Sequence, residues 1–192
     1  MFKSLSIVIP CYNESQNLNE LIKRVENTLI GVNYLIEVII VNNGSTDDTK
    51  DKLERLINNK KNIKVLNIGK NIGYGHGILE GLKICKHEFL GWTHADLQCD
   101  FVDCLKAFDL LYEESQSKEN IIIKGKRINR NMIDNLFTFL MSIFVLIFFQ
   151  KKITDINAQP KIFKRELYQN FFRPPQDFLL DLYILSLAKK LK

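Results

Sequence analysis

The sequence predicts an α/β fold in which a mostly parallel sheet is covered by helices on both faces. Short runs rich in β-branched residues alternate with segments of helical periodicity over the first two-thirds of the chain. The 192 residues, 46% of them hydrophobic, are enough for one compact domain with a sizeable core. Polar and glycine-rich segments follow the predicted strands, and ligands of parallel sheets bind at that carboxyl edge.

The first strand and the first helix show the two periods most clearly. Residues 4–10 form a nearly continuous apolar run, which is typical of a strand buried on both faces. Residues 15–30 follow with apolar side chains at helical spacing, so one face of this predicted helix is hydrophobic. That face carries Leu18, Leu21, Ile22, Val25 and Leu29.

The alternation continues along the chain. A second strand is expected over residues 37–41, and a second helix over residues 47–58 with Leu53, Leu56 and Ile57 facing inward. A third strand at 63–67 leads through a glycine-rich loop into a helix that ends at Ile84. The remaining elements are a strand at 88–92, a helix at 101–114 and a strand at 121–124.

Residues 136–149 form an uncharged segment of fourteen residues with five phenylalanines, shortly before Lys151 and Lys152. A helix of this length covers about 21 Å, short of the roughly 30 Å hydrocarbon core of a bilayer. We expect an interfacial helix that lies on a membrane, because five phenylalanines exceed what one face of a small domain needs. A buried core helix is the alternative.

Composition narrows the class of partner. The formal net charge of +5 suits phosphate-bearing substrates or anionic lipids, and no basic run carries the aromatics or motif of a nucleic-acid module. Nucleic acid is therefore not an expected partner. The four cysteines lack paired spacing and the N-terminal apolar stretch is too short for a signal peptide, so we expect reduced thiols in the cytosol.

Four loops after predicted strands carry the candidate chemistry. Taken singly, each has a structural explanation, since their Asn, Ser and Gly residues form helix caps and turns. All four fall at the same edge of one sheet, which favours a ligand site. These loops are residues 10–14, 42–48, 71–77 and 94–98.

Together these segments resemble family 2 glycosyltransferases of the GT-A fold. The resemblance rests on IVIPCYNE (residues 7–14), NGSTD (43–47), the glycine loop and ADLQ (95–98), and it extends from Leu5 to about Ala188. The branch it resembles most contains dolichyl- and polyprenyl-phosphate sugar synthases. It implies a nucleotide-sugar-binding part over residues 1–128 and a helical part over 129–192 that faces the acceptor and the membrane.

The resemblance implies a nucleotide site made by the first loops. Asn42 and Asn43 stand where the family usually has an acidic pair. An amide oxygen can accept from a uracil imide N–H, but it would hold a guanine edge less well than a carboxylate. A UDP-sugar is therefore favoured over a GDP-sugar as donor. The implied nucleotide-binding residues are Pro10, Tyr12, Glu14, Asn43, Ser45, Gly73 and Asp96.

A divalent metal, Mg²⁺ or Mn²⁺, is the implied cofactor. The family's Asp-x-Asp loop reads His94-Ala95-Asp96 here and is followed by Leu97 and Gln98. The expected ligands are Asp96 and Gln98, with His94 as a third ligand or as a donor to the diphosphate. Mn²⁺ tolerates imidazole better than Mg²⁺ does.

The implied reaction inverts the anomeric carbon of the sugar by in-line displacement. A hydroxyl acceptor needs a general base, for which the resemblance suggests Asp181. A phosphate acceptor is already anionic and needs only cations to position it. The implied catalytic residues are Asp181, Asp96 and Arg127, and the implied acceptor-binding residues are Arg127, Arg130, Gln159 and Asp177, with Asp155 in the segment that closes over the acceptor.

Three hypotheses follow. The first is transfer to a polyprenyl phosphate in cell-envelope glycan synthesis, at the cytoplasmic face of the plasma membrane. The second is transfer to a hydroxyl of a surface or lipid-linked glycan. The third is a non-catalytic nucleotide-sugar-binding remnant, suggested by the replacements at Asn42, Asn43 and His94 and by a chain that ends earlier than its relatives do.

Overall fold

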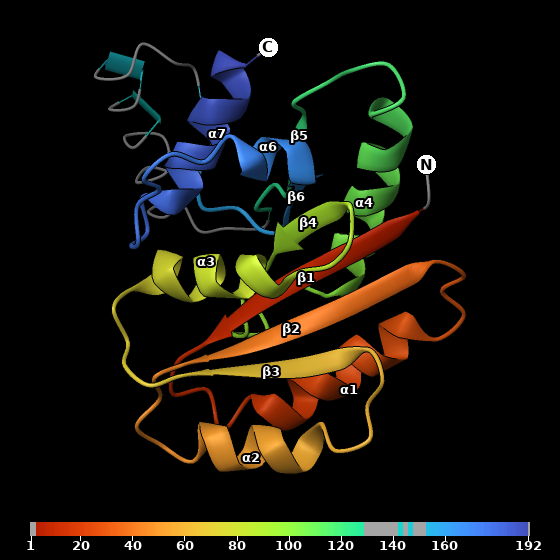
Figure 1. Ribbon diagram of the computed structural model, residues 1–192, viewed down its shortest axis with the longest axis vertical. Coiled ribbons are helices and arrows are strands. Elements are labelled where there is room, and N and C mark those ends of the chain that lie inside the picture. Colours follow the sequence, from red (N-terminus) through yellow and green to blue (C-terminus); the bar gives the residue numbers. More distant parts are fainter. Residues whose placement is uncertain (1–2, 129–141, 144–145, 148–152, 192) are drawn as a thin grey trace.

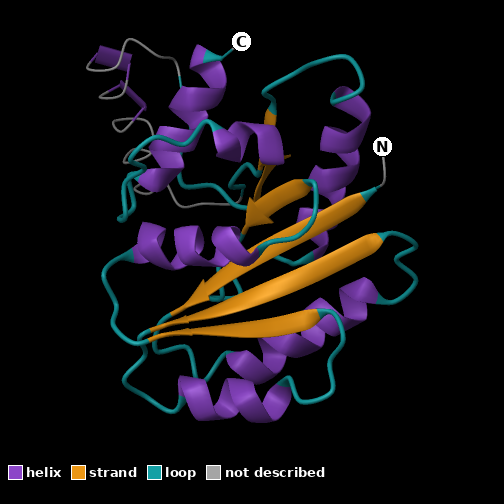
Figure 2. Cartoon of the chain, viewed as in Figure 1, coloured by secondary structure: helices purple, strands orange, loops and turns teal. Residues whose placement is uncertain are grey.

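A six-stranded sheet in the order β3-β2-β1-β4-β6-β5 lies at the centre of the protein, with helices on both faces (Figures 1 and 2). The computed structural model describes residues 3–128, 142–143, 146–147 and 153–191. The strands are β1 (Ser4–Cys11), β2 (Leu35–Asn43), β3 (Ile63–Ile68), β4 (Phe89–Trp92), β5 (Ile122–Lys124) and β6 (Lys161–Lys164). The helices are α1 (Leu18–Leu29), α2 (Thr49–Leu56), α3 (Tyr74–Ile84), α4 (Val102–Glu114), α6 (Arg165–Gln169) and α7 (Leu180–Lys190). The predicted α/β class and all five predicted strands are confirmed.

Strands β1 to β4 are parallel, so their carboxyl ends share one edge of the sheet. Their registers place the polar strand ends close together: Cys11 pairs with Asn42, and Asn43 pairs with Ile68. On its other side β1 pairs with β4, where Val8 lies opposite Trp92, just before the loop that carries His94. The predicted loops therefore leave the sheet side by side.

Strand β6 was not predicted. It runs antiparallel between β4 and β5, and all four of its residues are buried. Its sequence, Lys-Ile-Phe-Lys, is bounded by two lysines, which usually lie at the surface. Here the Lys161 ammonium is fully buried in an ion pair, and the Lys164 ammonium donates to the backbone carbonyl of Ser115.

The two faces of the sheet carry separate hydrophobic clusters. Alternate residues of β1 point to opposite faces, as the period of two in a strand requires, so Ile7 and Val8 belong to different clusters. One cluster joins the sheet to α1, α2 and α4, and the other joins it to α3, α6 and α7. The second cluster connects helix α3 with the C-terminal helix α7.

The apolar segment 136–149 lies almost wholly outside the described residues, so the expectation of an interfacial helix stays a prediction. Within the described ranges no helix has both the length and the apolar character needed to cross a bilayer. All four cysteines are free thiols; Cys11, Cys85 and Cys104 are buried and Cys99 is partly exposed, as expected.

A buried carboxylate ties the central strands together at the end opposite the loops. Glu37 of β2 is 5% exposed and accepts hydrogen bonds from the Ser6 hydroxyl at 2.8 Å and the Lys86 backbone N–H at 2.6 Å. The Lys64 ammonium lies 2.6 Å from its other oxygen. Burial alone would raise the pKa of Glu37, but these donors outweigh it and hold that pKa below its ordinary value.

The substitution Glu37→Gln is expected to lower the free energy of unfolding at pH 7 by about 1–3 kcal/mol, because a charge-assisted set of hydrogen bonds is lost in a buried place. A lowered folded-state pKa contributes stability in full above the ordinary glutamate pKa of about 4.3, and this contribution is lost as the pH falls below that value and through the lowered folded-state pKa. The difference between the two proteins in urea denaturation should therefore shrink progressively as the pH falls below about 4.3. Glu113→Gln, at an exposed position of α4, is the matched control.

Candidate active site

A cavity of about 490 Å³ opens at the carboxyl edge of the parallel strands. It brings together three side chains from three separate loops: Glu14 after β1, Asn43 at the end of β2 and Asp96 after β4. Seven residues predicted for the nucleotide or the metal line this one cavity: Pro10, Tyr12, Glu14, Asn43, Gly73, His94 and Asp96.

The loops after β1 and β2 are joined by hydrogen bonds. The backbone of Asn13, at φ 56°, donates to the Ser45 hydroxyl at 3.0 Å, and its side-chain oxygen accepts from the Thr46 N–H at 2.8 Å. The Glu14 N–H donates to the Thr49 hydroxyl at 3.0 Å. Ser45, predicted to bind the nucleotide, does not line the cavity, and its hydroxyl holds the two loops together.

The two asparagines at the end of β2 have different roles. Asn42 is structural, because its amide donates to Asn67 at 2.9 Å and accepts from the Ser45 N–H at 3.1 Å. Asn43 lines the cavity, and its amide nitrogen donates to the Gly73 carbonyl at 3.0 Å. The Asn43 side-chain oxygen is buried without a partner among the described residues. This oxygen can accept a hydrogen bond.

The start of α3 is packed against the segment that precedes α7. Gly73 has φ 154°, and a Cβ there would meet the Gln176 carbonyl at 2.4 Å, so only glycine allows this approach. The His76 N–H donates to the same carbonyl at 2.8 Å. Phe178, which lines the cavity, stacks on the Tyr74 ring with centroids 4.8 Å apart. One wall of the cavity therefore comes from the C-terminal part.

The loop after β4 holds one carboxylate at the cavity. His94 Nδ1 lies 3.7 Å from Asp96, and the proximity of this imidazole, which outweighs burial, lowers the pKa of Asp96. The Gln98 N–H donates to the other Asp96 oxygen at 3.0 Å, whereas the Gln98 side chain is exposed and does not line the cavity. The other ring nitrogen of His94, Nε2, lies 2.9 Å from the Tyr74 hydroxyl and forms a hydrogen bond with it.

These residues fit a divalent cation through Asp96. The described residues contain no group of three His, Cys, Asp or Glu side chains that could hold a metal by themselves. Mg²⁺ is commonly bound by one or two carboxylates together with substrate phosphates, and Asp96 offers one such carboxylate. Of the three predicted ligands, Asp96 and His94 line the cavity, with His94 Nε2 hydrogen-bonded to Tyr74, whereas the exposed Gln98 side chain does not line it.

Asp181 lies in the core, away from the cavity. It is 1% exposed and pairs at 2.9 Å with the ammonium of Lys161, which is fully buried. The Trp92 indole N–H donates to the same oxygen at 3.1 Å, and the Gln159 amide lies 3.3 Å from the other one. A general base must reach the proton that it removes. The suggested role of Asp181 as that base therefore does not suit this geometry. Gln159, suggested to bind the acceptor, is also buried, at 7% exposed.

The loop after β5 is organised around Asp155, at φ 49°. Its carboxylate accepts from the Arg127 N–H at 2.7 Å and from Arg127 Nε at 2.5 Å. Burial alone would raise the pKa of Asp155, but these Arg127 donors outweigh it and lower that pKa. This pair fixes the orientation of Arg127, which does not line the cavity. Asp177 is exposed and accepts from the Leu179 N–H at 2.8 Å, and Arg130 lies outside the described residues.

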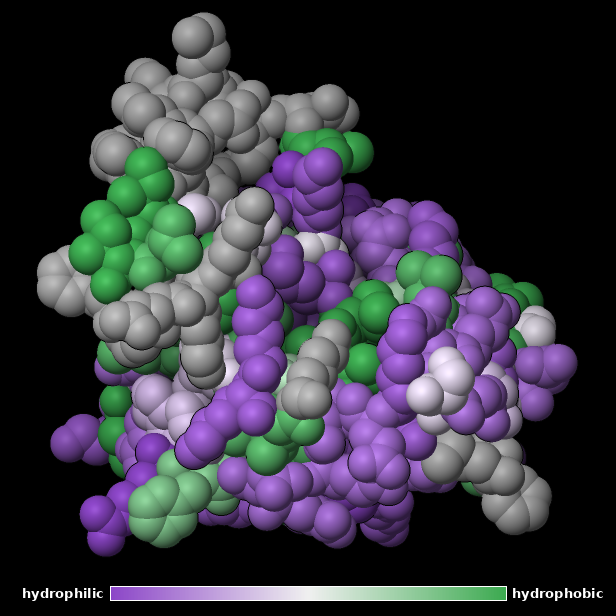
Figure 3. Space-filling view, turned by 90° about the horizontal axis from the view of Figure 1, so that it is seen from above, coloured by the Kyte–Doolittle hydropathy of each residue, from purple (hydrophilic) through white to green (hydrophobic). Residues whose placement is uncertain are grey.

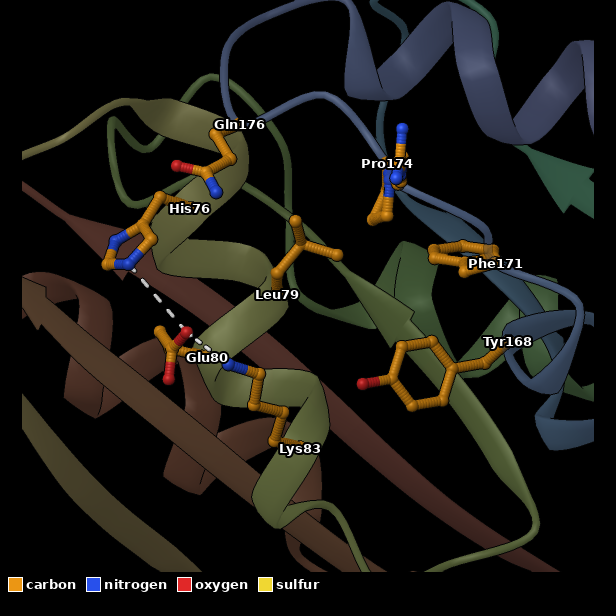
Figure 4. A pocket seen from close by; sticks show the side chains of 9 residues that line it. His76, Leu79, Glu80, Lys83, Tyr168, Phe171, Pro174 and Gln176 are labelled. Atoms are coloured by element: carbon orange, nitrogen blue, oxygen red, sulfur yellow. Dashed lines mark hydrogen bonds and ion pairs between the residues drawn. The ribbon is translucent and has the colours of Figure 1, made fainter.

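A second cavity of about 560 Å³ lies between α3, α6 and the segment before α7 (Figure 4). His76 and Lys83 both approach Glu80 from the same side of α3, at 3.7 and 2.5 Å, and the rings of Tyr168 and Phe171 lie across from them. The charged groups of α3 are thus paired with one another. Gln176 lines this cavity and Phe178 the first, so the segment between them separates the two.

Sequence reasoning missed four residues around the site: Tyr74, Trp92, Phe178 and Lys161. Tyr74 lies in the loop that was selected for its glycines, and Phe178 lies between Asp177 and Asp181, which were selected as carboxylates. Trp92 was assigned only to a strand. One signal for Lys161 was its place directly before the apolar pair Ile162 and Phe163. If that pair is buried in a strand, the adjacent lysine is buried too, and a buried ammonium needs a counter-charge.

A mostly parallel sheet covered on both faces, with a cavity at the carboxyl edge of its parallel strands, is the architecture of the GT-A class of α/β proteins. The chain belongs to glycosyl transferase family 2, whose family model matches residues 6–172. The resemblance drawn from the motifs is confirmed.

Similar proteins include a dolichol-phosphate mannosyltransferase of Pyrococcus furiosus, 36% identical over 94 residues that cover 49% of this chain and 26% of the relative. A dolichyl-phosphate beta-glucosyltransferase of Dictyostelium discoideum is 25% identical over 204 residues, covering 97% of this chain and 62% of the relative. The chain thus spans less than two thirds of either relative.

Among solved structures, glucosyl-3-phosphoglycerate synthase from Mycobacterium tuberculosis, in complex with Mn²⁺ and uridine diphosphate, superposes with a TM-score of 0.71. The match covers 95% of this chain and 63% of that one at 17% identity, so it establishes the fold alone.

The substitution Lys161→Met is expected to lower the free energy of unfolding by about 3–5 kcal/mol, because the Asp181 carboxylate is left buried without a counter-charge. The double variant Lys161→Met/Asp181→Leu should recover much of this loss, since it removes both charges. Urea denaturation measures all three proteins, and Lys23→Met, at an exposed position of α1, is the control. A double variant no more stable than the single one would contradict the assignment of this ion pair.

Proposed function

We propose that the protein is an inverting glycosyltransferase that moves a sugar from a nucleotide-sugar donor, with UDP favoured, to a polyprenyl-phosphate acceptor at a membrane surface. The observation that carries the proposal is the convergence of Glu14, Asn43 and Asp96 in one cavity at the carboxyl edge of the sheet. The names of the two curated relatives, both dolichol-phosphate sugar transferases, support the acceptor class.

The chemistry of the cavity suits a nucleoside diphosphate. Asn43 supplies a buried acceptor oxygen for an imide N–H of a base, and Tyr12, which is 46% exposed, supplies an aromatic face beside it. Asp96 would hold the divalent ion. When bound, Mg²⁺ or Mn²⁺ neutralises charge on the departing nucleotide diphosphate. The part of this chain is to orient the donor so that an acceptor can attack the anomeric carbon in line.

The position of Asp181 favours an anionic acceptor. A hydroxyl would need a base beside the anomeric carbon, and the carboxylate suggested for that task is buried and paired with Lys161. An acceptor phosphate is itself a nucleophile and needs cations to position it. Arg127, held by Asp155, offers the planar donor set that binds phosphate oxygens in pairs.

A membrane location is part of this proposal. Several large apolar side chains of the C-terminal part are exposed, among them Phe172 at 75%, Phe178 at 67% and Ile147 at 65%. In the view from above, hydrophobic surface gathers on the left of the molecule and polar surface covers the right and lower parts (Figure 3). Such separation suits a protein that docks on lipid with one side.

Binding is tested by the melting temperature in the presence of UDP-, GDP- and dTDP-sugars, with and without Mn²⁺. A ligand at 100 times its Kd stabilises the folded state by about 2.7 kcal/mol, and the largest shift is expected with a UDP-sugar and Mn²⁺. Asn43→Ala should weaken UDP binding about tenfold, since one good hydrogen bond is lost. Asp96→Asn should abolish the Mn²⁺-dependent part of the shift.

The controls are Asn58→Ala, at an exposed position, and Asp103→Asn, at a half-buried position of α4; both lie outside the cavity and should leave every shift unchanged. The proposal fails if no nucleotide-sugar raises the melting temperature of the wild-type protein, or if both Asn43→Ala and Asp96→Asn respond as it does.

Transfer is tested with a labelled donor and vesicles that contain either undecaprenyl phosphate or undecaprenol. Label should enter the lipid fraction only with the phosphate, and the product anomer should be inverted relative to the donor. Transfer to undecaprenol or to a glycan hydroxyl would support the alternative acceptor class. Binding of the donor without transfer to any acceptor would support a non-catalytic protein.

A further inference from the structure

A continuous chain of polar contacts connects the cavity with the buried ion pair. It starts at His94, whose Nε2 lies 2.9 Å from the hydroxyl of Tyr74, the first residue of α3. The Gln159 amide nitrogen lies 3.2 Å from the same hydroxyl and 3.3 and 3.5 Å from the two oxygens of Asp181. Asp181 in turn pairs with Lys161.

The direction of each hydrogen bond follows from the ion pair. A carboxylate beside an ammonium carries its charge and can only accept, so Gln159 must present its NH₂ group to Asp181. The same nitrogen then gives its second hydrogen to the Tyr74 oxygen. In this orientation the side-chain oxygen of Gln159 is buried without a partner in the described part of the chain. The unmade hydrogen bond is destabilising, and the hydrogen bonds to Asp181 offset it.

The orientation of Gln159 determines that of Tyr74. Its oxygen accepts from Gln159, so its own hydrogen is free to go to His94 Nε2. Burial, and after it the Asp181 charge, raises the pKa of Tyr74 well above its ordinary value, so the hydroxyl keeps its proton. A neutral imidazole that accepts at Nε2 carries its hydrogen on Nδ1. That nitrogen faces Asp96 at 3.7 Å.

We propose that Tyr74 is a positioning residue: through Gln159 and the Lys161–Asp181 ion pair it fixes His94 as the Nδ1–H tautomer. His94 then directs an N–H at Asp96 and orients that carboxylate, and it offers no lone pair to a cation in the cavity. The inference rests on the proposed function only where it concerns the metal. The tautomer itself does not depend on it.

The tautomer is read from long-range ¹H–¹⁵N spectra of the histidine rings at about pH 8.5, two units above the ordinary histidine pKa. The chain has three histidines, so His76→Gln and His87→Gln assign the signals. In the wild-type protein, the protonated nitrogen of His94 should be Nδ1. In Tyr74→Phe, which keeps the stacking on Phe178, the two nitrogen shifts should move toward the Nε2–H pattern.

Tyr168→Phe, which removes a hydroxyl from the second cavity, is the matched control and should leave the His94 signals unchanged. Gln159→Met breaks the chain at a second point and should shift the His94 signals in the same direction. An Nε2–H pattern in the wild-type protein overturns the inference, as does an unchanged His94 spectrum in both folded variants.

A binding measurement tests the consequence at the metal. In Tyr74→Phe, the Mn²⁺ concentration needed for half-maximal UDP binding should rise about 10- to 100-fold, the effect usual for groups that orient a ligand. UDP affinity without Mn²⁺ should change by a smaller factor than this Mn²⁺ requirement does. A wild-type protein that binds no UDP sinks the proposed function and leaves the spectroscopic result standing. Equal Mn²⁺ requirements in a variant with a shifted tautomer would overturn the link from His94 to Asp96.

Discussion

The buried ion pair between Lys161 and Asp181 determines how helix α7 meets the central sheet. It joins β6, an antiparallel strand inserted between β4 and β5, to α7. Two charges this deep need a counter-charge and further hydrogen bonds, which Trp92 and Gln159 supply. The pair therefore tolerates few arrangements of its neighbours, and β4, β6 and α7 must come together for it to form.

The hydrogen bonds of the ion pair continue to the cavity through Gln159 and Tyr74. Asp181 accepts only, so Gln159, Tyr74 and His94 each have one allowed direction of donation. The glycines at the start of α3 permit the segment before α7 to approach closely, and that segment carries Phe178 to the cavity wall. The site is thus assembled from both parts of the chain, although its polar residues come from the loops of the parallel strands.

The sequence alone predicted the parallel strands and the edge at which the cavity lies. It did not predict strand β6 or the roles of Ser45 and Asp181, and each of these has a physical reason. Strands β1 and β2 are long apolar runs, which gave their positions, and the alternation of strands with helices gave the shared edge that gathers Glu14, Asn43 and Asp96. Strand β6 was not predicted, because its four residues begin and end with lysine and are too few to show the alternation of a strand. The roles of Ser45 and Asp181 depend on partners 20 or more residues away, Asn13 and Lys161, and no local pattern reveals such pairs.

The location of the indole has a practical consequence. The chain contains a single tryptophan, and its N–H is bound to Asp181 at the centre of the polar core. Indole emission responds to the charge and hydration around the ring, so ultraviolet fluorescence of the unmodified protein reports on this core without any dye. The fold thereby contains its own optical probe at the junction of its two parts.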